Sequence, residues 1–240
     1  MFPWLKLAVL SLAILAYIFI GGRNLNQTEE DAVQLVDLYV IEELTEVTMS
    51  WKDSTGDLYN NFSNLASSRP DAGMVFATNG GMFHVSKDPV GLYVENGLTF
   101  SELNVSEGEG NFFIEPNGVF SIFSDRYSIL TTDEFLLAEI DPIFATQSGP
   151  MLIIDGQINQ AFNESSDNVF IRSGVCLDGE ILKFAISNEE ISFYDFSSFL
   201  LDTGCVDALY LDGYISQMYA PEINRFDEGL DYGVIISVFE

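Results

Sequence analysis

Short apolar segments separated by Asn-Gly or Asp-Gly pairs fill the middle of the chain, and this pattern limits its fold more than any other feature. Both pairs readily take the positive φ angles that two-residue hairpin turns require. They stand in VENGLTF and EPNGVFS, and again in MLIIDGQIN and VCLDGEILKF. We therefore predict antiparallel hairpins that turn at residues 96–97, 117–118, 155–156 and 178–179.

Helical patterns are fewer. The segment GDLYNNFSNLASSRP places Leu58, Phe62 and Leu65 at helical spacing, TTDEFLLAEI has the pattern of a capped short helix, and SFYDFSSFLLDTGC ends at a glycine. The combination predicts an α+β fold. We expect a single domain over residues 45–240, made mainly of antiparallel or mixed β-sheet with a few flanking helices, after a linker or edge segment over residues 24–44.

The N-terminus is strongly apolar. Lys6 precedes an apolar run from Leu7 to Ile20, which is shorter than the roughly 20 residues that a membrane span needs. Residues 1–23 are therefore predicted to form an apolar helix that serves as a signal peptide or as a membrane anchor, with residues 2–20 as the part that would attach to a membrane. Either outcome predicts an exported protein, periplasmic or extracellular.

The charge of the chain is strongly negative. Its 37 acidic and nine basic residues give a formal net charge of −28, which repels nucleic acid and argues against it as a partner. Cys176 and Cys205 would both lie in an oxidising compartment after export, where a disulfide persists. Pairing and two buried free thiols both remain open from the sequence, because it does not give the distance between the two side chains.

Several common functional motifs are missing from the sequence. It has neither a phosphate-binding nucleotide loop nor a nucleophile elbow. His84 is the single histidine, which excludes a zinc site built on several imidazoles from one chain. We expect neither a metal nor another cofactor.

Four apolar segments end in polar residues. MVFATNGGMFH leads to Asn79 and His84, PIFATQSGPML to a Gln-Ser-Gly sequence, NVFIRSGV to Arg172, and ALYLDGYIS to Asp212. Ordinary turns explain most of these residues equally well. Arg172 is harder to explain in this way, since a buried guanidinium needs an anionic ligand or a carboxylate partner such as Asp212. Both interpretations of Arg172 remain open here.

The order of these motifs is similar to that of the phosphodiester glycosidase domain family. The matching segments are NGGMFH, PVGLYVENG, GNFFIEPNGVFSI, ATQSGPMLIIDG, IRSGVCLDG, FAIS, FYDFSSF and ALYLDGYIS, within about residues 45–221. The resemblance implies hydrolysis of the bond between a sugar anomeric carbon and a phosphodiester phosphate, with a phosphosugar or glycan-phosphate as substrate. Many relatives have Asn where this chain has Ser173, and some have glycine where it has Tyr214.

The resemblance also implies roles for individual residues. The expected catalytic residues are Asp212, as nucleophile or base, Arg172 and His84, which would contact the departing phosphate, and Asn79. The expected substrate-binding residues are Gln147, Ser148, Gly149, Gly213, Tyr214 and Ser216. The alternative is a non-catalytic envelope- or glycan-binding domain on the same fold. Convergence of Asn79, His84, Arg172 and Asp212 would favour the enzyme.

Overall fold

The computed structural model describes residues 34–212 and 215–240, and these residues form three β-sheets with antiparallel pairing. The β11 sheet has the order β1 (Val36–Ile41), β12 (Ile181–Ser187), β11 (Ser173–Asp178), β13 (Asp207–Tyr210), β9 (Met151–Ile154), β10 (Gln157–Ile158). The β3 sheet has the order β15 (Arg225–Phe226), β14 (Met218–Ala220), β3 (Met74–Asn79), β16 (Ile235–Phe239), β2 (Val47–Ser50). The β8 sheet has the order β5 (Leu98–Ser101), β4 (Tyr93–Glu95), β8 (Phe144–Ser148), β6 (Gly118–Ile122), β7 (Tyr127–Thr131).

Three of the four predicted hairpins are confirmed: β4 with β5, β9 with β10, and β11 with β12. At the first turn Asn96 and Gly97 have φ angles of 52° and 75°, and at the second Asp155 and Gly156 have 49° and 72°. These are the positive angles that make such pairs effective in tight turns. The third turn consists of residues 179 and 180, because Asp178 already pairs with Ile181.

The predicted hairpin at residues 117–118 is wrong. Gly118 lies in β6, where it pairs with Thr131 of β7 and with Ser148 of β8. A β-carbon at this glycine would collide with the Met151 side chain. Close packing, not turn geometry, accounts for the glycine at position 118. Residues 111–113 form a short 3₁₀ helix, whereas the predicted hairpin required a strand before its turn.

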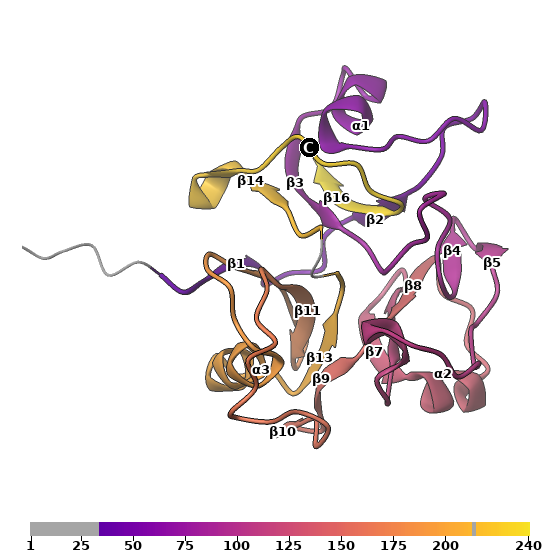
Figure 1. The fold of residues 1–240 in the computed structure, drawn as a ribbon. Coiled ribbons are helices and arrows are strands. Elements are labelled where there is room, and N and C mark those ends of the chain that lie inside the picture. Colours follow the sequence, from indigo (N-terminus) through magenta and orange to yellow (C-terminus); the bar gives the residue numbers. More distant parts are fainter. Residues whose placement is uncertain (1–33, 213–214) are drawn as a thin grey trace, which may run out of the picture. The chain divides into compact units, whose positions relative to one another are not determined.

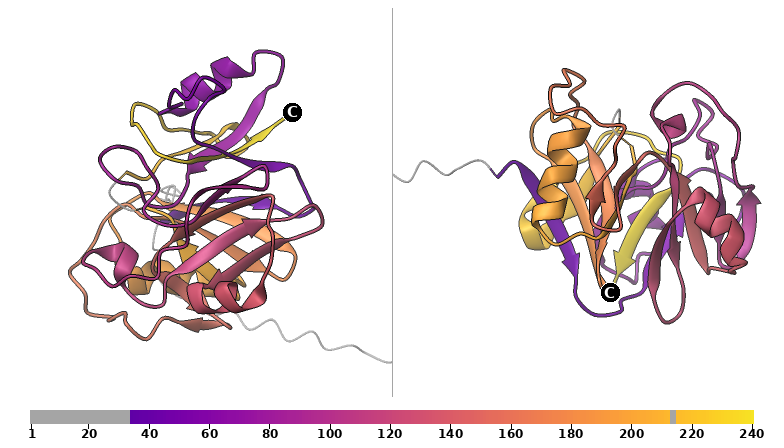
Figure 2. Two further views of the ribbon diagram at one scale, coloured as in Figure 1. Left: turned by 90° about the vertical axis from the view of Figure 1, so that its right-hand side faces the viewer. Right: turned by 90° about the horizontal axis from the view of Figure 1, so that it is seen from below.

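All three predicted helices are present: α1 (Phe62–Ser68), α2 (Thr132–Ala138) and α3 (Phe193–Asp202). Each begins after a residue whose side chain accepts a backbone hydrogen bond, namely Asn61, Thr131 and Ser192, as expected for N-caps. Leu58 lies outside α1, because the helix begins only at Phe62. Figure 2 shows α3 against one side of the β11 sheet, where Phe196 and Leu200 are fully buried.

The three sheets surround a common core (Figure 1). Phe76 from β3, Phe120 from β6 and Phe184 from β12 meet there, with ring centroids 4.8 Å apart for Phe76 and Phe184 and 6.0 Å apart for Phe120 and Phe184. Burial of large aromatic side chains is the main source of stability in such a core. Smaller clusters lie under α3 and α1. The observed architecture agrees with the predicted α+β class.

Cys176 and Cys205 form a disulfide with an S–S distance of 2.06 Å, so of the two alternatives that the sequence leaves open, the structure has the paired one. It connects β11 to the turn that follows α3.

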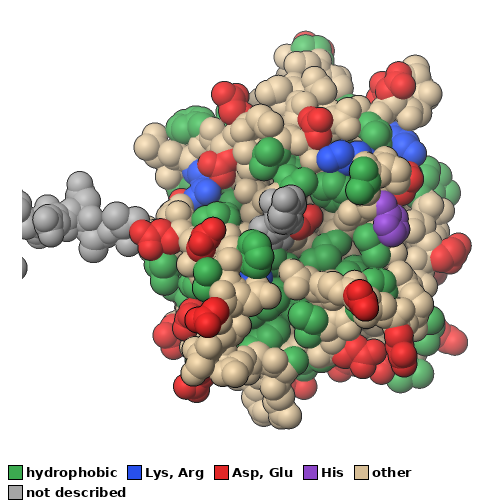
Figure 3. Space-filling model, viewed as in Figure 1, with side chains coloured by type: hydrophobic (Ala, Val, Ile, Leu, Met, Phe, Trp, Pro, Cys, Tyr) green, Lys and Arg blue, Asp and Glu red, His purple; other side chains and the backbone are tan. Residues whose placement is uncertain are grey.

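On the face shown in Figure 3, acidic side chains are spread around the periphery while hydrophobic side chains gather near the centre.

Residues 1–33, which include the predicted signal peptide or anchor with its apolar helix, lie outside the described residues. Of the predicted segment 24–44, residues 36–41 form β1, an edge strand of the β11 sheet. Within residues 34–212 and 215–240, no helix is both long and apolar enough to cross a membrane.

Candidate active site

Four strand ends meet at one place in the molecule. β3 ends at Asn79, β8 ends at Ser148, β11 begins at Ser173, and Leu211 and Asp212 follow β13. The Ser148 hydroxyl donates to the Leu211 carbonyl over 2.7 Å, and the Asn79 amide donates to Ser173 Oγ over 3.0 Å. Since β3, β8 and β11 belong to three different sheets, these hydrogen bonds join the sheets. We call the group Asn79, Ser148, Ser173, Asp212 and Ser216 the junction.

Ser173 is the centre of the junction. Its hydroxyl donates to the Asp212 carbonyl over 2.8 Å and lies 3.0 Å from Ser216 Oγ, which is also bonded to that carbonyl. The Asn79 side-chain oxygen accepts from the Gln217 backbone N–H over 3.3 Å. Asn79, Ser148 and Ser173 are fully buried, so the hydrogen bonds from Asn79 to Ser173 and from Ser148 to Leu211 are shielded from water, while those to Asp212, Ser216 and Gln217 are partly buried.

Replacing Ser173 by Ala is expected to lower the free energy of unfolding by about 1–3 kcal/mol, because it removes the hydroxyl that accepts from the buried Asn79 amide and donates to the Asp212 carbonyl. Ser121→Ala is the matched control. Ser121 is equally buried, yet its hydroxyl has no hydrogen-bond partner among the described residues. Urea unfolding should show a loss for Ser173→Ala and little change for Ser121→Ala, and equal effects would contradict this account of the junction.

Arg172 is fully buried next to the junction. Its Nε donates to the Ile191 carbonyl over 2.7 Å, and its Nη2 donates to the backbone and side-chain oxygens of Asn168 over 2.8 and 3.2 Å. The guanidinium carbon lies 3.6 Å from the centre of the Phe193 ring. Burial lowers the pKa of the guanidinium, and Tyr210 opposes that shift. Neutral oxygens and an aromatic face therefore hold this cation in one orientation.

Tyr210 contacts Arg172, and it is not among the site residues predicted from the sequence. Its hydroxyl accepts from Arg172 Nη1 over 3.4 Å. Burial raises the pKa of the Tyr210 phenol, while the charge of Arg172 lowers it and the charge of Asp212 raises it. The phenol thus interacts with both charges. The available signal was the spacing of Tyr210 and Asp212, since residues two apart on an extended chain share a face.

His84 lies on the loop that leads away from Asn79. Its side chain is exposed, and its backbone N–H donates to the Asp88 carbonyl over 2.8 Å. The loop packs closely on β8, because Gly81 donates to Thr146 Oγ1 over 3.2 Å and a β-carbon at Gly81 would collide with the Gln147 carbonyl. The described hydrogen bonds of the junction do not include the imidazole.

The predicted substrate-binding residues of β8 are tightly packed. The Gln147 side chain accepts from the backbone N–H groups of Leu92 and Asn104, and donates to the Asn104 carbonyl and Thr132 Oγ1. A β-carbon at Gly149 would lie 2.6 Å from the Phe112 carbonyl oxygen. Gln147 and Gly149 therefore fix the backbone on which Ser148 sits.

Of the remaining predicted residues, Ser216 belongs to the junction, while Gly213 and Tyr214 lie outside the described residues. In the part of the chain that the structure describes, no three His, Cys, Asp or Glu side chains are grouped as a metal site. A cavity of about 380 Å³ is lined by residues 61–64 at the start of α1, by Gln217 and by residues 228–232. The backbone N–H of Gln217 donates to Asn79, whereas its side chain bonds to Glu228 and Tyr232.

Comparison with known proteins places these residues in a family. The phosphodiester glycosidase family matches residues 72–232, which contain all members of the junction. The uncharacterized protein YigE of Escherichia coli K12 is 38% identical over 194 residues, which cover 79% of this chain and 76% of YigE.

Two solved structures share the fold. The catalytic domain of zebrafish N-acetylglucosamine-1-phosphodiester alpha-N-acetylglucosaminidase, auto-inhibited by its pro-peptide, superposes with a TM-score of 0.54 at 14% identity, covering 89% of this chain and 86% of that chain. A candidate exported protein of Burkholderia pseudomallei K96243 superposes with a TM-score of 0.53 at 9% identity, covering 85% and 73%. On the extent of the family match and its likeness to YigE, this chain belongs to the phosphodiester glycosidase family.

Proposed function

We propose that the chain is an exported hydrolase that cleaves the bond between a sugar anomeric carbon and a phosphodiester phosphate. The observation that carries this proposal is the meeting of four strand ends from three sheets at the junction, beside a buried arginine, Arg172, that donates a hydrogen bond to Tyr210, two residues before Asp212. A cation, a phenol and a carboxylate held together at strand ends suit the stabilisation of charge during hydrolysis.

The leaving group decides how much acid catalysis the site needs. Glycosidases that expel a sugar alkoxide use a carboxylic acid to protonate it and a second carboxylate as base or nucleophile. A phosphate monoester is a much better leaving group, because its last proton has a pKa of about 6. For such a leaving group, one carboxylate and a source of positive charge are sufficient to catalyse the hydrolysis.

In the proposed mechanism Asp212 attacks the anomeric carbon or activates the water that does so. The bond between the anomeric carbon and the bridging phosphate oxygen breaks, and its electron pair leaves with the phosphate monoester. Water supplies the new anomeric hydroxyl. Arg172 and Tyr210 hold the electrostatic environment of Asp212, and Asn79 fixes the neighbouring backbone. His84, on the exposed loop after Asn79, donates a hydrogen bond or a proton to the departing phosphate.

The proposed substrate site lies beside the junction. Ser216, which is half-buried, presents its hydroxyl to the substrate, while Ser148 holds the Leu211 backbone beside Asp212, supported by Gln147 and Gly149. Gly213 would leave space for the sugar, and Tyr214 would restrict which sugar enters.

Export is proposed on two grounds. The Cys176–Cys205 disulfide persists best in an oxidising compartment. The Burkholderia pseudomallei protein that shares the fold is itself described as a candidate exported protein.

A hydrolysis screen tests the proposed function. The purified chain is incubated with sugar 1-phosphodiesters that differ in sugar and aglycone, and release of the reducing sugar and of the phosphate monoester is measured. We expect equal amounts of both products from at least one substrate. Binding without release of either product would instead support the non-catalytic glycan-binding domain.

Replacing Arg172 by Lys is expected to reduce kcat for such a substrate at least about 10-fold, because one ammonium cannot reproduce the three-directional hydrogen bonding of the guanidinium. Arg225→Lys is the control: Arg225 pairs with Asp37 and Asp227, each over 2.8 Å, in a structural network. This control should lose stability and keep its kcat. Full turnover by a folded Arg172→Lys chain would exclude the role proposed for Arg172.

A further inference from the structure

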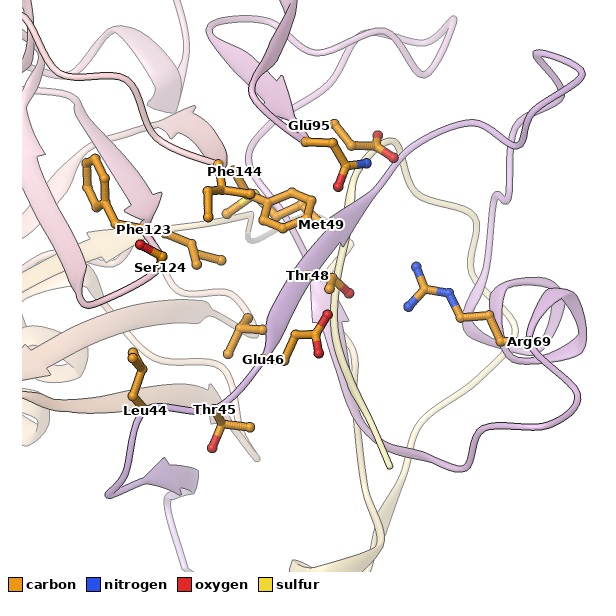
Figure 4. Close-up of a pocket in the computed structure, with 14 residues that line it drawn as sticks. Leu44, Thr45, Glu46, Thr48, Met49, Arg69, Glu95, Phe123, Ser124 and Phe144 are labelled. Atoms are coloured by element: carbon orange, nitrogen blue, oxygen red, sulfur yellow. The ribbon is translucent and has the colours of Figure 1, made fainter.

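A second cavity, of about 520 Å³, lies far from the junction along β8 (Figure 4). Phe144, the first residue of β8, lines it, whereas Ser148 at the other end of that strand belongs to the junction. The cavity is lined by β2, which is an edge strand, and by the ends of the strands β4, β6 and β8. Its volume falls within the range that small-molecule sites occupy.

The cavity combines an apolar floor with a polar rim. Val47, Met49, Ile122 and Phe144 supply buried apolar side chains, with exposed fractions between 1% and 8%. Thr48, Asn96 and Ser124 add neutral polar groups to the lining. Such a mixture suits a ligand with an apolar face and several polar substituents, as a sugar ring has.

Arg69, which follows α1, is the cation of this rim. Its Nη2 donates to Ser50 Oγ over 3.3 Å, and its guanidinium carbon lies 4.5 Å from the centre of the Phe239 ring. In the described part of this highly acidic chain, no carboxylate lies within 4.0 Å of Arg69. Most of its five N–H donors are thus available to an acidic ligand.

Two carboxylates line the same cavity. Glu95 is half-buried and accepts from the Tyr93 hydroxyl over 2.5 Å. Burial raises the pKa of the Glu95 carboxyl, against the opposing effects of hydrogen bonds from Tyr93 and the Trp51 backbone and of the Arg69 charge. In Figure 4 Glu46 and Arg69 point toward one another from opposite sides. Both carboxylates can accept hydrogen bonds from hydroxyl groups, and they would repel a ligand with several negative charges.

We infer that this cavity binds one unit of an acidic saccharide. The acid group, carboxylate or phosphate, pairs with Arg69, the hydroxyls donate to Glu46 and Glu95, and the sugar ring lies along the edge strand β2 between these three residues. The inference rests on the proposed function in one respect: the glycan polymer that the junction cleaves would also carry the acidic sugar that the cavity binds. The cavity would then retain the polymer while the junction cleaves it.

Calorimetric titration of the full chain tests the inference with four probes: glucose 6-phosphate, glucuronate, glucose and inorganic phosphate. We expect saturable binding of one or both acidic sugars, and which of them binds identifies the acid group. Glucose and inorganic phosphate should bind at least about 10-fold more weakly. Equal binding of glucose would exclude the role of Arg69, and equal binding of inorganic phosphate would reduce the cavity to a simple anion site.

Arg69→Gln is expected to weaken binding of the acidic sugar at least about 10-fold, because charge-assisted hydrogen bonds are lost. Arg225→Gln is the control, since Arg225 does not line the cavity and pairs with Asp37 and Asp227, each over 2.8 Å. This control should bind as the unmodified chain does. Unchanged affinity in Arg69→Gln, or no binding of either acidic sugar, would overturn the inference.

A kinetic arm separates this inference from the proposed function. Arg69→Gln should hydrolyse a short sugar 1-phosphodiester at an unchanged rate, while its KM for a polymeric acidic glycan rises. If the chain hydrolyses nothing, the titrations still decide whether the cavity binds acidic sugars. A reduced rate on the short substrate would show that Arg69 acts on the junction and would contradict a separate site.

Discussion

Turnover of a sugar 1-phosphodiester is expected to fall about 10³-fold when Asp212 is replaced by Asn, because an amide neither attacks the anomeric carbon nor accepts a proton from water. The loss should appear in kcat. The fold should remain intact, since the backbone carbonyl of Asp212, which Asn retains, makes the bonds to Ser173 and Ser216. Steady-state kinetics together with circular dichroism checks both statements.

Asp155→Asn is the control for this substitution. Asp155 also precedes a glycine in a turn, but its turn connects β9 and β10, and its φ angle of 49° is one that Asn accepts readily. Its kcat should match that of the unmodified chain. A folded Asp212→Asn chain with full turnover would remove Asp212 from the proposed mechanism.

Removal of the disulfide is expected to cause the largest loss of stability. Cys176 and Cys205 are separated by 29 positions in the sequence. Closing a loop of this length restricts the unfolded chain by about 3.5 kcal/mol on the chain-entropy account. The double variant Cys176→Ala and Cys205→Ala should therefore lose about that much free energy of unfolding, as measured by urea titration.

Reduction supplies the control for the disulfide prediction. A thiol reductant should destabilise the unmodified chain by a similar amount and leave the double variant unchanged. Equal stability of the oxidised and reduced chains would show that packing around β11 and α3, rather than the covalent link, holds this region together.

The hairpins show what local sequence can predict. At residues 96–97 and 155–156 the turn chemistry and the tertiary structure require the same backbone angles, so the prediction is confirmed. At Gly118 the same dipeptide signal is present, but contact with Met151 and pairing with β7 and β8 determine the conformation. These partners are distant in sequence, and a short pattern carries no information about them.

The candidate site shows the same contrast between what local sequence predicts and what long-range contacts determine. Polar residues after apolar segments indicated Asn79, Ser148 and Asp212, and in the structure hydrogen bonds to Ser173 and Leu211 bring these residues to one place. Tyr210 was not predicted, because its spacing from Asp212 is the only local feature that distinguishes it from a core tyrosine, and its contact with Arg172 depends on the fold. The four hydrogen bonds of Gln147 depend on where Leu92, Asn104 and Thr132 lie, which only the complete fold determines.

The position of the junction among three sheets makes it a property of the whole fold. Asn79 and Ser173 come from different sheets, as do Ser148 and Leu211, so local opening of any one sheet separates at least one of these pairs. Partly unfolded forms and proteolytic fragments would therefore retain strands and helices without retaining the site. Activity would report the population of completely folded molecules.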